Sequence, residues 1–148
     1  MIKIKRKKIF LLIILSFVIL NLSWFLITTI KYNKFIKAVP KNKHDIYFLQ
    51  DDDGYCYSVK KPNYLHYTGN LAVTNYEKGE HLIIWPLMSG GYKYGIRLEE
   101  DGRMFEAYVD ENMNPIHKDD ENSVQVIKEH KDQLDNLFSK ANQIWNLK

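Results

Sequence analysis

The chain has 148 residues, enough for one folded domain and a further segment, and it carries 21 basic and 18 acidic side chains. Ten of the basic residues lie in residues 1–43, whereas all 18 acidic residues lie beyond them, so residues 44–148 carry a net charge of −7. This acidic portion should repel nucleic acid, which excludes a nucleic-acid-binding protein. The single cysteine cannot form a disulfide within the chain.

Residues 9–30 read IFLLIILSFVILNLSWFLITTI and contain no charged side chain. A helix needs about 20 apolar residues to cross the ~30 Å hydrocarbon core of a bilayer, so this segment is predicted to be a transmembrane helix. A cleaved signal peptide is the alternative. Its apolar region is usually about 7–15 residues long and ends at a small-residue cleavage site, which this sequence lacks. We therefore predict an uncleaved signal anchor.

The basic residues on the two sides of this span predict its orientation. Five lysines and arginines lie in the N-terminal tail 1–8, and five lysines lie in the linker 31–44, so the two counts tie. The N-terminal group is denser and adds the α-amino charge. We therefore predict a cytoplasmic N-terminus, a basic juxtamembrane linker in which Pro40 stops any helix, and an extracytoplasmic domain over residues 45–148 at the cell membrane.

Alternating and β-branched residues after the linker predict about six short strands. They cover residues 45–50, 55–60, 70–75 and 81–87, and the two arms of a hairpin over 92–110. Short loops with turn residues, such as Lys78-Gly79, separate them, which is typical of an antiparallel meander. Residues 82–85 are apolar on both faces and predict a strand that is covered on both sides.

The hairpin over 92–110 gives the clearest local signal, because Asp101-Gly102 favours a two-residue turn of type I′. One face of the hairpin is then apolar and the other carries complementary charges. The register pairs Glu100 with Arg103, Leu98 with Phe105, Ile96 with Ala107, Tyr94 with Val109, Arg97 with Glu106 and Lys93 with Asp110.

Residues 94–116, YGIRLEEDGRMFEAYVDENMNPI, resemble the closing strands of PepSY-type domains, which are often anchored extracytoplasmic modules. The resemblance covers 23 of the 148 residues. Met113 or Asn114 stands where that family has a glycine, and the long helix follows the strands instead of preceding them. The resemblance therefore implies no function for this chain.

The period of the apolar residues changes to three and four between Ser123 and Leu147, which predicts one C-terminal amphipathic helix. Residues 119–122 supply carboxylates and capping side chains at its start. We expect its apolar stripe to pack on the sheet, which gives an α+β fold. The alternative is that the stripe is left for another protein.

No pattern in the chain predicts a catalytic, cofactor-binding or metal-binding residue. The run Asp51-Asp52-Asp53-Gly54 fits a hairpin loop, since an EF-hand aligned on Gly54 would place Leu49 and Lys60 at ligand positions. Cys56 has no histidine beside it, and the nearby carboxylates should raise its pKa. The histidines are dispersed, without the spacing of a zinc site.

Tyrosines concentrate around the loop 51–54, between residues 47 and 67. Tyrosine suits interfaces because it buries apolar area while its hydroxyl stays available for hydrogen bonds. Ordinary strand composition is the alternative explanation. The candidate partner-binding surface consists of Tyr47, Asp51, Asp52, Asp53, Tyr55, Tyr57, Tyr64 and Tyr67.

The sequence thus predicts a membrane-anchored, non-enzymatic binding or regulatory module, for example an immunity-type or inhibitory protein. Its partners would be membrane lipid for the span and a protein or cell-envelope component for the domain. The alternative is an accessory subunit of a membrane secretion or transport complex, in which the span recognises other helices through Ser16, Asn21, Ser23 and Trp24. A small hydrolase has the least support.

Overall fold

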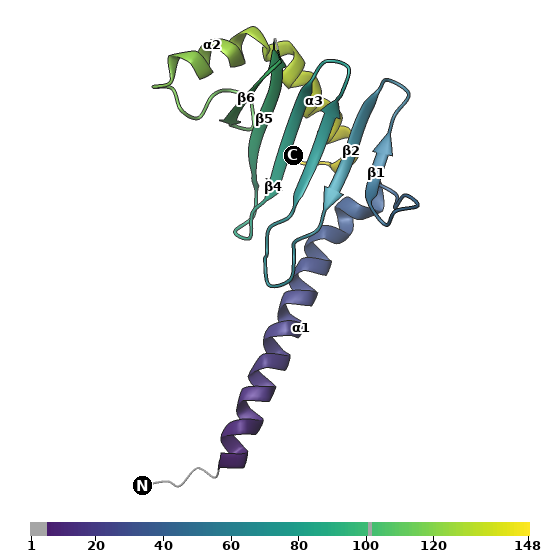
Figure 1. Ribbon diagram of the computed structural model, residues 1–148, viewed down its shortest axis with the longest axis vertical. Helices are drawn as coiled ribbons and strands as arrows, with labels where there is room; N and C mark the ends of the chain where they lie inside the picture. Colours follow the sequence, from purple (N-terminus) through teal and green to yellow (C-terminus); the bar gives the residue numbers. More distant parts are fainter. Residues whose placement is uncertain (1–5, 101) are drawn as a thin grey trace.

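The structure is a computed structural model that describes residues 6–100 and 102–148, with Glu100 described by its backbone alone. Residues 1–5 of the basic tail and Asp101 of the expected hairpin turn lie outside the described residues. The elements in chain order are α1 (Arg6–Ala38), β1 (Tyr47–Gln50), β2 (Tyr55–Lys60), β3 (Asn70–Asn75), β4 (Glu80–Pro86), β5 (Tyr92–Glu100), β6 (Arg103–Val109), α2 (Glu121–Glu129) and α3 (Lys131–Trp145) (Figure 1).

The described strands form one open antiparallel sheet in the order β1-β2-β3-β4-β5-β6. Each strand therefore pairs with its neighbours in the sequence, and the predicted α+β fold with a six-stranded meander is confirmed. The strand bounds agree with the sequence prediction to within two residues. This agreement follows from the short loops, which leave an antiparallel partner as the nearest one for each strand.

The register of the β5–β6 hairpin is also confirmed, with Ile96 opposite Ala107 and Arg97 opposite Glu106. The Arg97 Nε atom lies 2.7 Å from a carboxylate oxygen of Glu106. The expected pair of Lys93 with Asp110 is wrong, because β6 ends at Val109. Lys93 instead places its Nζ atom 3.8 Å from the centroid of the Tyr108 ring.

Helix α1 continues well past the apolar segment, through residues 31–38 of the expected linker. Tyr32 and Phe35 near its end, and Val39 directly after it, have almost no exposed surface, at 0%, 1% and 0%. The spacing of three residues puts Tyr32 and Phe35 on one helix face, while Lys31, Lys34 and Lys37 interrupt the run in the sequence. The end of α1 is therefore part of the domain core, and the chain leaves the helix just before Pro40.

The C-terminal segment forms two helices, so the prediction of one continuous helix is wrong. His130, with φ −101° and ψ 13°, separates α2 from α3. The capping expected within residues 119–122 is provided by Asp120, whose side chain accepts a hydrogen bond from the Ser123 N–H at 3.2 Å. The helical residues that belong to the core are Ile127, Leu134, Leu137, Phe138, Ala141 and Trp145.

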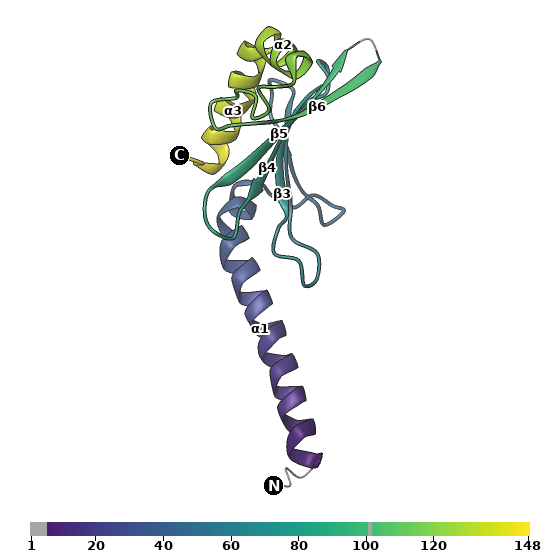
Figure 2. The same cartoon turned by 90° about the vertical axis from the view of Figure 1, so that its left-hand side faces the viewer.

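The two faces of the sheet differ in what covers them. Figure 2 shows α3 and the C-terminal end of α1 on the same side of the sheet. On that side the Phe138 ring meets the Tyr94 ring at 5.6 Å, and the Trp145 ring meets the Tyr57 ring at 6.0 Å. Along β4 burial alternates, and Ile83 and Trp85 are only half-buried. The expectation that β4 is covered on both faces is therefore wrong.

The buried end of α1 gives a first prediction. Phe35→Ala removes a ring from the core and is expected to lower the free energy of unfolding by about 3–5 kcal/mol. Phe10→Ala is the matched control, because Phe10 lies in the same helix and is 66% exposed. Denaturant unfolding of the detergent-solubilised full chain, followed by tryptophan fluorescence, measures both. Equal effects of the two substitutions would contradict the assignment of residues 32–39 to the core.

Candidate functional site

The acidic run forms the tip of the β1–β2 hairpin and is organised by Asp51. The Oδ1 atom of Asp51 accepts hydrogen bonds from the Tyr55 N–H at 2.8 Å and from the Asp53 N–H at 3.1 Å. Gly54 has a φ of 82°, the left-handed region that glycine enters without steric cost. An aspartate side chain that accepts hydrogen bonds from backbone N–H groups a few residues later is common in turns. The predicted hairpin loop is confirmed.

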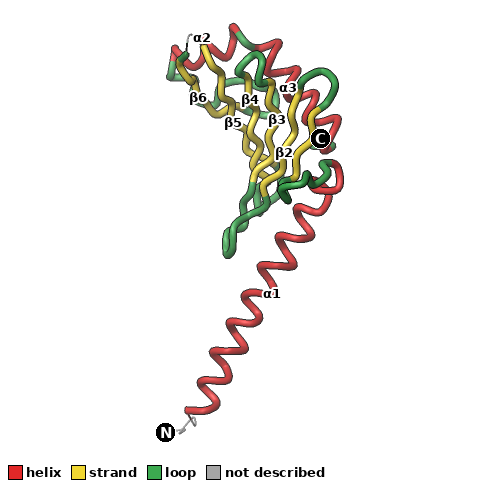
Figure 3. The backbone as a smooth tube through the Cα atoms, turned by 45° about the vertical axis from the view of Figure 1, so that its right-hand side comes forward, coloured by secondary structure: helices red, strands yellow, loops and turns green. Residues whose placement is uncertain are grey.

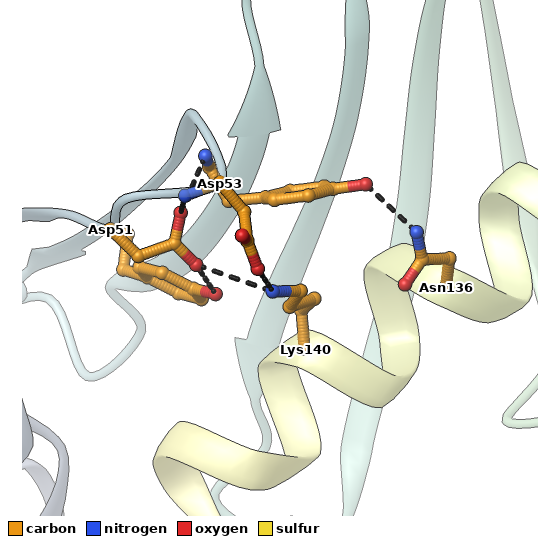
Figure 4. Close-up of polar contacts among 6 residues, drawn as sticks. Asp51, Asp53, Asn136 and Lys140 are labelled. Atoms are coloured by element: carbon orange, nitrogen blue, oxygen red, sulfur yellow. Dashed lines mark hydrogen bonds and ion pairs between the residues drawn. The ribbon is translucent and has the colours of Figure 1, made fainter.

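The same tip is tied to α3 (Figure 4). Lys140 places its Nζ atom 2.7 Å from a carboxylate oxygen of Asp53 and 3.4 Å from one of Asp51. The Asn136 amide donates a hydrogen bond to the Tyr55 hydroxyl at 2.8 Å. The Tyr57 hydroxyl donates to Asp51 at 2.9 Å. We call these residues the hairpin clamp: Asp51, Asp53, Tyr55, Tyr57, Asn136 and Lys140.

Electrostatics fixes the ionisation states in the hairpin clamp. Burial acts to raise the pKa of the Asp51 carboxyl, but hydrogen bonds from Tyr55 and Tyr57 and the charge of Lys140 hold that pKa below its ordinary value. Burial and the hydrogen bond to Asp51 raise the pKa of the Tyr57 hydroxyl. The hydrogen bond to Asp53 raises the pKa of Lys140. All three groups keep their ordinary charges, so the clamp acts as a structural contact.

The tyrosines of the candidate surface do not gather into one exposed patch. Tyr55 and Tyr57 are 7% and 2% exposed and face the helices. Tyr47 is half-buried on the edge strand β1. Tyr64 and Tyr67 lie in the β2–β3 loop, which begins at the opposite end of β2 from the acidic tip, and six residues of strand span about 20 Å. Of the acidic side chains at the tip, Asp52 and Asp53 remain exposed.

Cys56 lies on β2 between the two buried tyrosines and is itself buried. Burial, and secondly the charge of Asp51, raise the pKa of its thiol. The thiol therefore stays protonated at neutral pH, which disfavours a role as a nucleophile.

A cavity of about 570 Å³ lies on the sheet face opposite to α3. Its floor is formed by β4, β5 and β6, and one wall by the segment that leads into α2. We call it the open-face cavity. Its lining residues are Ile83, Trp85, Gly95, Ile96, Arg97, Glu106, Ala107, Tyr108, Pro115, His117, Asp119, Asp120 and Ser123.

The floor of the open-face cavity depends on Gly95. A Cβ atom at this position would lie 2.8 Å and 2.9 Å from two carbons of the Trp85 ring, so only glycine lets the indole lie across β5. The Trp85 ring then meets the Tyr108 ring at a centroid distance of 6.0 Å. The result is a half-exposed aromatic floor beside the ion pair of Arg97 and Glu106.

The wall of the cavity brings Ser123 and Asp120 together, but as a helix cap. The Ser123 Oγ atom donates to Asp120 at 2.5 Å, and this bond, with that of the Ser123 N–H, lowers the pKa of the Asp120 carboxyl. The carboxylate therefore accepts hydrogen bonds from the start of its own helix and stays ionised. This arrangement favours binding through the aromatic floor over bond-breaking chemistry at the serine.

Sequence reasoning missed the open-face cavity. The apolar run 82–85 places Trp85 in a strand that is expected to be covered on both faces, and the strand pattern of β5 gives Gly95 no evident role. A glycine inside a strand signals a close approach by another group. In the β4–β5 register Gly95 lies opposite Ile83, two residues before Trp85. That position is the signal in the sequence that a side chain of β4 could lie across β5.

The hairpin clamp gives a second prediction. Asp51→Asn removes the charge but keeps the size, and is expected to lower the free energy of unfolding by about 1–3 kcal/mol at pH 7. Asp52→Asn, in the same loop and exposed, should change it by no more than ~0.5 kcal/mol.

The pH dependence of this difference follows from the lowered pKa of Asp51. The carboxylate stabilises the fold above its unfolded pKa of about 3.9, and the contribution is lost as the pH falls through the folded value. Denaturation midpoints of wild type and Asp51→Asn should therefore converge below about pH 4. A constant difference over the whole acidic range would contradict the charged role of Asp51.

Comparisons of this chain with models of protein families, with curated proteins and with solved structures find no match. The hairpin clamp consists of internal contacts. The open-face cavity is exposed to an external ligand.

Proposed function

We propose that the protein is a membrane-anchored, non-enzymatic binding module whose extracytoplasmic domain holds a partner in the open-face cavity. The cavity is the observation that carries this proposal, because it places two aromatic rings on the sheet face opposite to α3, where the start of α2 forms only one wall. Aromatic side chains supply large contact area at low entropic cost, and they are enriched in protein interfaces.

The properties of α1 support the anchor. The described helix is long and apolar enough to cross a membrane, and none of its most apolar stretch is buried against the domain. The basic residues at its start support a cytoplasmic N-terminus. The same helix continues without a break into the core at Tyr32 and Phe35. A cleaved signal peptide would have to end inside this continuous helix, which favours an uncleaved anchor.

The chemistry of the cavity indicates the kind of partner. Apolar and aromatic groups form the floor, and the carboxylates of Glu106, Asp119 and Asp120 stand around it with Arg97 and His117. The domain as a whole is acidic. This combination fits a protein segment that inserts an apolar side chain and carries basic groups beside it. An immunity-type or inhibitory role, in which the partner is a secreted or envelope protein, is consistent with such a surface.

The accessory-subunit alternative relied on polar groups of the span being open to other helices. Two of these groups are engaged within this chain. The Asn21 side chain donates to the Phe17 carbonyl at 2.8 Å and accepts from the Tyr64 hydroxyl. Trp24 donates to the His66 carbonyl at 2.6 Å. These contacts favour the span as an anchor and the cavity as the recognition site.

The proposal is tested by site-specific photo-crosslinking of the full chain in its native membranes. A photoreactive residue at Tyr108, on the cavity floor, is expected to capture a partner, and one at Lys128, exposed on α2, is not. Gly95→Val should abolish the capture at Tyr108, because the added side chain displaces the Trp85 ring. Capture at Lys128 alone, or capture at Tyr108 unaffected by Gly95→Val, would contradict the cavity as the binding site.

A variant of the span separates the two candidate functions. Replacing residues 9–20 with an unrelated apolar sequence, together with Ser23→Leu, removes Ser16 and Ser23 but keeps the contacts of Asn21 and Trp24 with the domain. Capture at Tyr108 is expected to persist in this variant. Its loss would favour the accessory-subunit role, in which the span itself recognises the complex.

A further inference from the structure

The loop between β2 and β3, residues 61–69, descends along α1 instead of turning at the end of the sheet (Figure 1). The Tyr64 hydroxyl donates to the Asn21 side chain, and the Tyr64 ring meets the Trp24 ring edge-on at 5.3 Å. The Trp24 indole N–H donates to the His66 carbonyl at 2.6 Å. These contacts fix the tip of the loop at the level of Asn21 and Trp24.

This level lies inside the expected hydrocarbon layer. Lys8 and Lys31 bound the uncharged part of α1, which has 22 residues. A hydrocarbon core of ~30 Å that begins at Ile9 ends near Thr28, at 1.5 Å per helical residue. Asn21 is seven residues before Thr28, so the Tyr64 hydroxyl sits about 10 Å below that boundary. The loop therefore reaches membrane depth whenever α1 spans the bilayer.

The tip of the loop presents apolar surface there. Tyr64 is 56% exposed and Leu65 is 43% exposed, although both are large. Leu65 also has a φ of 59°, a left-handed conformation that is costly for a residue with a bulky side chain. The strained backbone is therefore at Leu65, whose apolar side chain is exposed. Such strain is typical of positions with a function.

The charges of the surrounding connections agree with a membrane on this side. Figure 3 shows the loops at the α1 end of the sheet as green segments next to the helix. The connections 39–46 and 61–69 carry Lys41, Lys43 and Lys61, and Lys60 ends β2 beside them. The one acid of these two connections, Asp45, pairs with Lys41 at 3.0 Å. The connection after β6 also starts at this end of the sheet and begins with Asp110 and Glu111. The acidic run Asp51 to Asp53 lies at the other end of the sheet. Lysines at the membrane end meet anionic head groups.

We propose that the β2–β3 loop is a second membrane contact, in which Tyr64 and Leu65 enter the outer leaflet beside α1 and the flanking lysines bind its lipid head groups. The inference rests on the proposed anchoring by α1 and adds a partner, the lipid bilayer, for a loop of the domain. Tyrosine suits this depth because its ring lies among acyl chains while its hydroxyl is bonded to Asn21.

Part of the loop backbone has hydrogen-bond partners inside the protein, as polar groups need at that depth. The His66 N–H donates to the Asn63 carbonyl at 2.9 Å, and the His66 carbonyl accepts from Trp24. The Gly69 N–H donates to the buried Tyr32 hydroxyl at 2.6 Å. Contacts with α1 therefore hold the loop both at its tip and at Gly69. The position of α1 in the bilayer then sets the depth of the loop.

The test uses the full chain in vesicles of phosphatidylglycerol and phosphatidylcholine, with the native thiol removed by Cys56→Ala. A fluorophore is attached in separate variants at Leu65→Cys, at Val18→Cys within the span, and at Asp52→Cys at the far end of the sheet. Asn63→Cys serves as a second reporter in the same loop. Circular dichroism confirms the fold of each variant, and nitroxide groups on the acyl chains of the lipid quench any fluorophore that they reach.

The proposal expects the Leu65 and Val18 fluorophores to lose most of their emission, while the Asp52 fluorophore keeps its emission. Quenching at Val18 without quenching at Leu65 and Asn63 would overturn the membrane contact of the loop while the anchor stands. Absence of quenching at Val18 would overturn the anchor and, with it, this inference. Quenching at Asp52 equal to that at Leu65 would also overturn the proposal, because the two ends of the domain would then be equally close to the lipid.

Discussion

The arrangement of the molecule depends on the continuity of α1 from its exposed apolar part into the domain core. A single helix carries the exposed residues of the expected span and, a few turns later, the buried Tyr32 and Phe35. A flexible linker would let the domain turn freely above the membrane. A continuous helix fixes the direction in which the sheet points, because helical residues have no free dihedral angles to absorb a rotation.

Because this direction is fixed, the sheet has one end next to α1 and one end that points away from it. The connections that flank β1 and β2 at the α1 end carry lysines and exposed apolar residues, whereas the acidic tip Asp51 to Asp53 lies at the opposite end. At that far end the hairpin clamp joins β1 and β2 to α3, so the carboxylates of Asp51 and Asp53 stabilise the fold through Lys140. The open-face cavity lies on the sheet face opposite to α3, with the start of α2 as one wall.

Much of the fold could be predicted from the sequence because its signals are local. The strand bounds, the β5–β6 register and the cap at Asp120 follow from alternation, turn residues and helix starts that a few neighbouring positions determine. Pro40 predicts where the helix stops, but the burial of residues 32–39 in the core is not predicted, because the lysines of residues 31–37 conceal a narrow apolar stripe. The break at His130 was missed because the apolar spacing continues across it.

The sites could be predicted less well, because each joins segments that are distant in the sequence. The clamp brings Lys140 and Asn136 to the acidic tip from more than 80 residues away. Tyr55 and Tyr57 were read as surface residues because nothing local shows that α3 lies over them. The open-face cavity depends on Trp85 lying across Gly95, a contact between strands that residue types alone do not reveal.

The continuity of α1 can be measured directly as the distance between spin labels at Val18 in the span and Asp52 at the far end of the domain. The measurement uses pulsed electron paramagnetic resonance on the full chain in lipid nanodiscs. A rigid helix that belongs to both the anchor and the core predicts a single narrow distance distribution. A broad distribution, as a flexible linker over residues 31–44 would give, would contradict the account.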